Sequence, residues 1–174
     1  MEYIFNALLF CYYMIERGTY RLIIKCFAPI LKVYLKFTYN LDPFHCIQNK
    51  YNSADKFIKD KFRVGNEADS NLDYGYSMTR SEGSLIIVCA PYIQYVLIFV
   101  ERIIYRQRII DPVTFFWIAL LISGVINYFF CFRNDKYLLY FKILNNKGHK
   151  WIWISLSIMF AFISIILAVL SLKL

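Results

Sequence analysis

Three long apolar stretches dominate the second half of the chain, at about residues 85–104, 113–132 and 152–172. Each is close to the ~20 residues that a helix needs to cross the hydrocarbon core of a bilayer, and the last two contain no charged side chain. A water-soluble domain of this size could not bury so much apolar surface, since 59% of the residues are hydrophobic. The pattern therefore predicts an all-α, multi-pass transmembrane helical bundle over residues 84–174.

Residues 1–40 combine a short apolar run with a basic amphipathic helix. The run from Tyr3 to Ile15 has thirteen residues. As a helix it would reach only ~20 Å, short of the ~30 Å hydrocarbon core. We therefore expect this run to lie at the interface or to re-enter the membrane, and the sequence leaves open whether it crosses.

Five basic residues recur along the helix expected next in the chain: Arg17, Arg21, Lys25, Lys32 and Lys36. At ~100° per residue they fall within about 100° of arc, and apolar residues occupy the rest of the helix. A basic stripe on an apolar helix is typical of an interfacial element that binds anionic lipid headgroups. The alternative is a basic lining for an aqueous, anion-selective path in an oligomer, and the composition does not decide between the two.

Residues 41–83 form a polar segment, which we expect to be small and cytoplasmic. Ser53 could cap a helix that has Asp55 in its first turn. After Val64 the composition turns to Gly, Asn, Asp and Ser, which predicts a loop. The segment is too short to hold its own core without metal or disulfides, so we expect it to pack on the bundle or to order on a partner.

The distribution of charge predicts the topology. Of the 20 Lys and Arg residues, sixteen lie in residues 16–83 and 133–151, and four lie elsewhere. The positive-inside rule makes the basic-rich side cytoplasmic, which places the C-terminus outside. Within this side, residues 136–144 are predicted to form a short amphipathic helix along the membrane surface.

Small and polar residues recur on one face of each predicted span. Lipid tails are as apolar as leucine, so transmembrane helices associate through close packing at small residues and through polar side chains that find partners. The positions that we expect at helix contacts or lining a pore are Gln94 on the first span, Ala119, Ser123 and Asn127 on the second, and Ser157, Ala161, Ser164, Ala168 and Ser171 on the third. The stripes could face one another within one chain, meet another copy or a partner, or line an aqueous path.

Gln94 and Asn127 are the strongest of these signals. An unpaired amide in hydrocarbon costs several kcal/mol, so both side chains have to face a partner or water. Each interhelical hydrogen bond contributes only ~0.6–2 kcal/mol, but it determines which helix faces meet.

The sequence contains no constellation that indicates an enzyme. The five cysteines have no paired spacing, and neither His45 nor His149 has the spaced partners of a zinc site. We therefore expect no catalytic residue, no metal and no cofactor. The basic residues lack the interleaved aromatic residues of a nucleic-acid groove, so nucleic acid is not expected as a partner.

The stretch INYFFCFRNDKYLLYFKIL, which begins at Ile126, is followed by a basic loop and a last apolar span. It resembles small multi-pass membrane proteins of Bacteroidetes-type bacteria. The matching residues are Asn127 and Tyr128 at the end of the second span, and Lys136 and Tyr137 in the cytoplasmic stretch. The resemblance covers the last third to half of the chain and implies a bacterial inner-membrane setting, with no particular activity.

These features favour a non-enzymatic membrane protein that acts by helix–helix association with its own copies or with another membrane protein, in an accessory or immunity-type role. The alternative is an oligomeric pore-forming or membrane-perturbing effector, with a path lined by Asn, Gln and Ser side chains.

Overall fold

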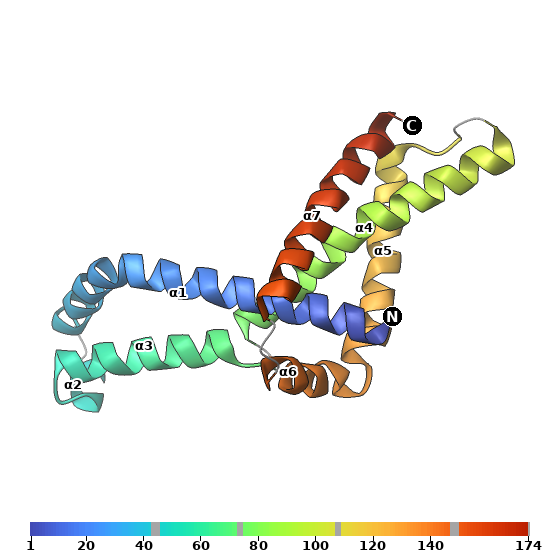
Figure 1. Ribbon diagram of the computed structural model, residues 1–174. Coiled ribbons are helices and arrows are strands. Elements are labelled where there is room, and N and C mark those ends of the chain that lie inside the picture. Colours follow the sequence, from blue (N-terminus) through green and yellow to red (C-terminus); the bar gives the residue numbers. More distant parts are fainter. Residues whose placement is uncertain (43–45, 73–74, 107–108, 147–149, 174) are drawn as a thin grey trace. The chain divides into compact units, whose positions relative to one another are not determined.

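The computed structural model describes residues 1–42, 46–72, 75–106, 109–146 and 150–173, and over these residues every regular element is a helix (Figure 1). The all-α prediction is confirmed. In chain order the elements are α1 (Glu2–Asn40), α2 (Cys46–Lys50), α3 (Ala54–Ser70), α4 (Tyr76–Tyr105), α5 (Pro112–Asn127), η1 (Tyr128–Phe132), η2 (Arg133–Asp135), α6 (Lys136–Asn146) and α7 (Lys150–Lys173).

Three helical stretches are long and apolar enough to cross a membrane: Tyr76–Tyr105, the continuous stretch Pro112–Asn146, and Lys150–Lys173. At the level of length and composition, the three predicted spans are confirmed. The first of these stretches, α4, begins earlier than predicted. The Gly75 carbonyl accepts hydrogen bonds from the amides of Met78 and Thr79 at 3.0 Å and so starts the helix.

Both ends of α5 follow from local chemistry. Asp111 caps the helix, since its Oδ2 accepts from the amides of Val113 and Thr114 at 3.0 and 3.3 Å, and Pro112 occupies the first turn. After the π-helical turn η1 the chain changes direction at Asn134, whose φ is 62°. Asparagine tolerates this left-handed conformation better than most residues. The short helix predicted over residues 136–144 is confirmed as α6.

The loop predicted after Val64 is wrong, because α3 continues to Ser70. Arg63 pairs with Glu67 one turn further on, with Nη1 3.0 Å from Oε1. The carboxylate of Asp69 is buried and accepts a 2.7 Å hydrogen bond from the hydroxyl of Ser77. The polar residues of this stretch therefore make helix-stabilising pairs and a tertiary contact, which a composition count does not distinguish from loop chemistry.

The described chain divides into two compact units: residues 1–14 together with 80–174, and residues 15–79. This grouping differs from the predicted segments, which end at residues 40 and 83, because α1 contributes to both units. The first part of α1 is buried in the first unit, where the Phe10 and Tyr13 rings lie 5.1 and 5.4 Å from the ring of Phe141 in α6.

In the second unit, α1 and α3 form a helical hairpin, and we call residues 15–79 the hairpin (Figure 1). Its closed end is held by Phe57, whose ring centroid lies 6.0 Å from that of Tyr39 and 5.2 Å from that of Tyr51. The Tyr39 hydroxyl also donates to the Tyr51 carbonyl at 3.0 Å. Ser53 caps α3 as predicted, with its hydroxyl 3.3 Å from the amide of Lys56.

Candidate interaction seams and basic surface

The predicted stripe on α7 faces the inside of the chain. Its three serines are buried and its two alanines are partly buried: Ser157, Ser164 and Ser171, and Ala161 and Ala168. Ser155, only two residues from Ser157, is exposed, so burial follows the stripe and not the residue type. The hydroxyl of Ser157 donates to the Trp153 carbonyl at 2.8 Å within the same helix, which leaves a small, satisfied surface for a neighbouring helix.

The neighbours of α7 come from the same chain. The Tyr92 ring of α4 stacks on the Phe160 ring with centroids 4.4 Å apart, and its hydroxyl donates to the Phe160 carbonyl at 2.7 Å. The hydroxyl of Tyr12 in α1 lies 3.4 Å from the Ser157 carbonyl. The small residues of α7 therefore admit side chains of α4 and of the first turns of α1.

The predicted positions on α5 also point inward. Ala119, Ser123 and Asn127 are all buried. The Ser123 hydroxyl donates to the carbonyl of Ile86 in α4 at 2.9 Å, which is an interhelical hydrogen bond of the expected kind. Asn127 donates its amide to the Ser123 carbonyl at 2.9 Å, while its Oδ1 has no hydrogen-bond partner in the described part of the chain.

Polar side chains of α4 fix the start of α5. Gln94 is buried, and its Nε2 donates to the Pro112 carbonyl at 2.9 Å. One turn before the end of α4, Glu101 Oε1 accepts from the amides of Ile109 and Ile110 at 3.0 and 2.7 Å. The carboxylate thus satisfies two backbone donors of the connection to the next helix.

Sequence reasoning missed Asn6, which is fully buried in the first unit. Its Nδ2 donates at 2.9 Å both to the Glu2 carbonyl and to the Phe130 carbonyl of η1. Nearby, the carboxylate of Glu2 pairs with Lys136 of α6 at 2.7 Å. The signal was available, because an asparagine inside the apolar run 3–15 calls for a partner just as Asn127 does.

Comparison of the chain with protein-family models, with curated proteins and with solved structures finds no match in any of the three. The resemblance of the C-terminal part to Bacteroidetes-type membrane proteins therefore stays a prediction.

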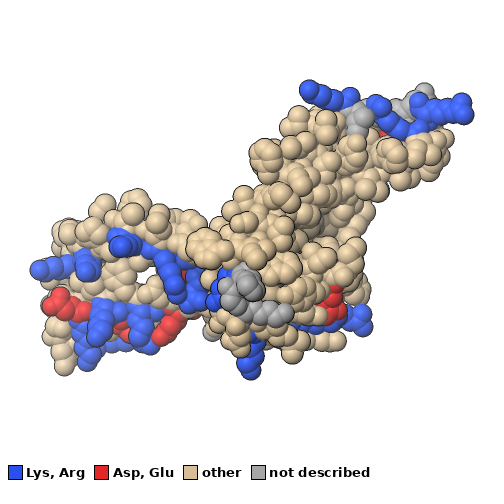
Figure 2. All heavy atoms as spheres, in the orientation of Figure 1, with Lys and Arg blue, Asp and Glu red and all other residues tan. Residues whose placement is uncertain are grey.

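The five residues of the predicted basic stripe lie on one flank of α1 in the hairpin. In Figure 2 blue spheres of Lys and Arg lie along the side of α1 that borders α3, and the opposite side of α1 is tan. That opposite side is an exposed apolar face, whose side chains are 45 to 71% exposed. It consists of Leu22, Ile23, Phe27, Ile30, Val33, Tyr34 and Phe37. Lipid-headgroup binding by the stripe stays a prediction, and the uncovered face beside it is what a membrane surface would cover.

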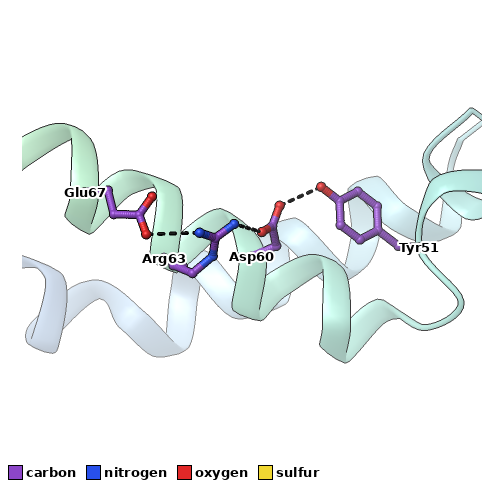
Figure 3. A network of polar contacts seen from close by, with 4 residues as sticks. All are labelled: Tyr51, Asp60, Arg63 and Glu67. Carbon is purple, nitrogen blue, oxygen red and sulfur yellow. Dashed lines mark hydrogen bonds and ion pairs between the residues drawn. The ribbon is translucent and has the colours of Figure 1, made fainter.

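The outward side of α3 carries an ordered network of charges, drawn in Figure 3. The hydroxyl of Tyr51 donates to Asp60 at 2.7 Å, and Arg63 bridges Asp60 and Glu67 at 2.8 and 3.0 Å. The hydrogen bond from Tyr51, with a smaller effect from Arg63, lowers the pKa of the Asp60 carboxyl below its ordinary value. This side of the hairpin is therefore hydrophilic and carries both signs of charge.

The remaining reactive residues are not gathered into a site in the part of the chain that the structure describes. No group of three or more His, Cys, Asp or Glu side chains there could hold a metal ion. Cys11, Cys89 and Cys131 are buried as free thiols, whereas Cys26 and Cys46 are exposed. Both histidines lie outside the described residues.

Proposed function

We propose that the protein is a non-enzymatic integral membrane protein that acts by association with another membrane protein or with its own copies, in an accessory or immunity-type role. Its three apolar helices serve as the anchor, and the hairpin is the surface that binds. The expected location is a bacterial inner membrane, with residues 16–83 and 133–151 in the cytoplasm and the C-terminus outside.

The observation that carries this proposal is that the small and polar positions predicted on the three spans are buried or partly buried within one chain. Ser123, Ser157 and Ser164 make their close contacts internally, so they offer no free seam to a second molecule. The surface that remains for a partner is the hairpin, whose α3 side presents the charged network of Asp60, Arg63 and Glu67. Mixed charges of this kind are typical of the rim of a protein–protein contact and favour specific partners.

The placement of the hairpin at the membrane surface is supported by α1. Between Arg17 and Asn40 the helix contains five basic residues and no acidic one, and its apolar face is exposed. Anionic headgroups and the acyl boundary would cover the two features together. In this arrangement α1 lies against the bilayer and α3 faces the cytoplasm, where a partner can reach it.

In the part of the chain that the structure describes, no specific contact favours the alternative of a pore. The amides of Gln94 and Asn127 donate to carbonyls of the same chain, so they are engaged as packing groups. We therefore expect that induced expression leaves the membrane potential unchanged when it is followed with a potential-sensitive dye.

Co-purification of two differently tagged copies, with the mass of the complex measured in nanodiscs, tests the proposal. The double variant Lys56→Glu, Arg63→Glu on the exposed side of α3 is expected to lose the second copy or a defined co-purifying membrane protein. The matched double variant Arg102→Glu, Lys142→Glu reverses two exposed charges in the other unit and should keep it. A monomer without any associated protein, or equal loss in both variants, would contradict the proposal.

A further inference from the structure

A groove of about 530 Å³ runs between α1 and α3 on the basic flank of the hairpin. One wall is formed by Lys32, Val33 and Lys36 of α1, and the other by Asp55, Ile58, Lys59 and Phe62 of α3. The sequence predicts only a stripe of cations on a single helix. The hairpin adds Lys59 from the second helix and so turns part of the stripe into a two-walled site.

The electrostatics of the groove favour an anion. Three lysines line it against one carboxylate, that of Asp55. Within the part of the chain that the structure describes, none of the three ammonium groups forms a hydrogen bond or an ion pair, in contrast to Arg63 and Lys136, which are paired. Unpaired ammonium groups that converge on one cavity are able to neutralise a phosphate.

The floor and the rim of the groove are apolar, which favours a lipid over a soluble anion as its ligand. Ile58 and Phe62 are half-buried in the floor, and Val33 is 71% exposed at the edge. Val33 lies three and four residues from Ile30 and Phe37, so the three share one helix face. The groove therefore opens directly onto the uncovered apolar face of α1, and a free phosphate would use only its cationic part.

We propose that this groove binds a single anionic phospholipid, with the phosphate between Lys32, Lys36 and Lys59 and an acyl chain along Val33 and Phe37. The inference rests on the membrane-surface placement in the proposed function and does not depend on the identity of a protein partner. Its role would be to fix the hairpin at one depth and rotation on the bilayer, because a lipid held by two helices ties both of them to the headgroup layer.

Native mass spectrometry of the full-length protein in detergent, titrated with phosphatidylglycerol or with phosphatidylcholine, tests the site. The wild-type chain should retain phosphatidylglycerol in preference to phosphatidylcholine. The variant Lys32→Gln, Lys36→Gln, Lys59→Gln should lose at least about tenfold in affinity for phosphatidylglycerol, since each lysine near an anionic surface contributes on the order of fivefold. All three side chains are exposed, so the fold should be kept, and the helical signal in circular dichroism checks this.

The control variant is Lys50→Gln, Lys56→Gln, Lys61→Gln, which removes the same charge from the hairpin outside the groove. It should retain phosphatidylglycerol. Equal losses in the two triple variants would overturn the proposal in favour of diffuse attraction, and no loss in either would overturn it outright. Displacement of the lipid by millimolar inorganic phosphate, together with unchanged lipid binding in Val33→Asn, would assign the groove to a soluble anion and overturn it as well. A failed partner test leaves these outcomes unaffected, because no partner is present in the titration.

Discussion

At the scale of single residues, buried polar groups decide how this apolar chain packs. Asn6, Gln94 and Asn127 each donate an amide hydrogen to a backbone carbonyl, and two of these bonds join different elements. In hydrocarbon the alternative to such a bond is an unsatisfied dipole, so the bonds of Asn6 and Gln94 favour one arrangement of the elements that they join. The bond of Asn127 is made within α5.

The carboxyl of Asp60 should report the hairpin network through its titration. Its folded-state pKa lies below the ordinary 3.8 because Tyr51 and Arg63 donate to the charged form. The stability that this adds is present above the ordinary value and is lost as pH falls below about 3.8 and through the folded pKa. Carbon-detected NMR should show the pKa of Asp60 rising in Tyr51→Phe, and not in Tyr34→Phe, which changes an exposed tyrosine of α1. An unchanged Asp60 pKa in Tyr51→Phe would mean that the hydrogen bond does not form.

Gly75 is required by a close backbone approach. A Cβ at this position would lie 2.1 Å from the Asn71 carbonyl oxygen and 2.6 Å from that of Asp69. Both are backbone atoms, so neither can give way as the end of a flexible side chain would. Gly75→Ala should therefore destabilise the protein by about 3 kcal/mol, measured as a fall in the unfolding midpoint in detergent.

Gly18→Ala is the matched control, because no atom lies within 4 Å of a Cβ built there, inside α1. It should stabilise the helix by about 0.5–1 kcal/mol, since alanine loses less backbone freedom than glycine. Equal effects of the two substitutions on the midpoint would show that the close approach at Gly75 is absent.

At the scale of elements, the sequence predicts most of the helices but not all of their ends. The Ser53 cap predicts the start of α3, and the long apolar runs predict the three spans, because these signals are local. The extension of α3 past Val64 and the early start of α4 could not be predicted. The Arg63–Glu67 pair and the Gly75 carbonyl support these helix ends locally. The contact of Asp69 with Ser77, by contrast, exists only once both helices are in place.

The candidate site divides in the same way. Small-residue periodicity found the inward faces of α5 and α7, and the stripe of cations found the basic flank of α1. Periodicity cannot say which helix covers a face, so it left open whether the serines meet the same chain or another copy. It also could not place Lys59 opposite Lys32, because the packing of α1 against α3 is a tertiary contact that helix periodicity does not report.

Leucine substitutions along α7 test which face is packed. Ser157→Leu adds bulk to a fully buried position and should destabilise the protein by about 1–3 kcal/mol, because overpacking forces the helices apart. Ser155→Leu makes the same chemical change at an exposed position of the same helix and should be close to neutral. Unfolding midpoints of both variants in the same detergent measure the difference, and a larger loss for Ser155→Leu would reverse the assignment of the inward face.

At the scale of the whole molecule, one chain joins a helical bundle able to span the membrane and a basic hairpin. α1 belongs to both units, since its residues up to Met14 group with the spans and the rest groups with α3; in the first part, Asn6 to Tyr13 are buried. The helix α1 runs from Glu2 to Asn40, with Pro29 inside it.

Cysteine labelling in sealed membrane vesicles tests the three crossings on which this account rests. The native thiol of Cys46 is exposed, so a membrane-impermeant maleimide should label it only in inside-out vesicles of the Cys26→Ser variant. Cys26 itself lies on the apolar face of α1, which the bilayer is proposed to cover. Lys173→Cys, in a chain with both native exposed cysteines changed to serine, should label only in right-side-out vesicles. Three crossings require this opposition, and labelling of the hairpin and of position 173 from the same side would contradict it.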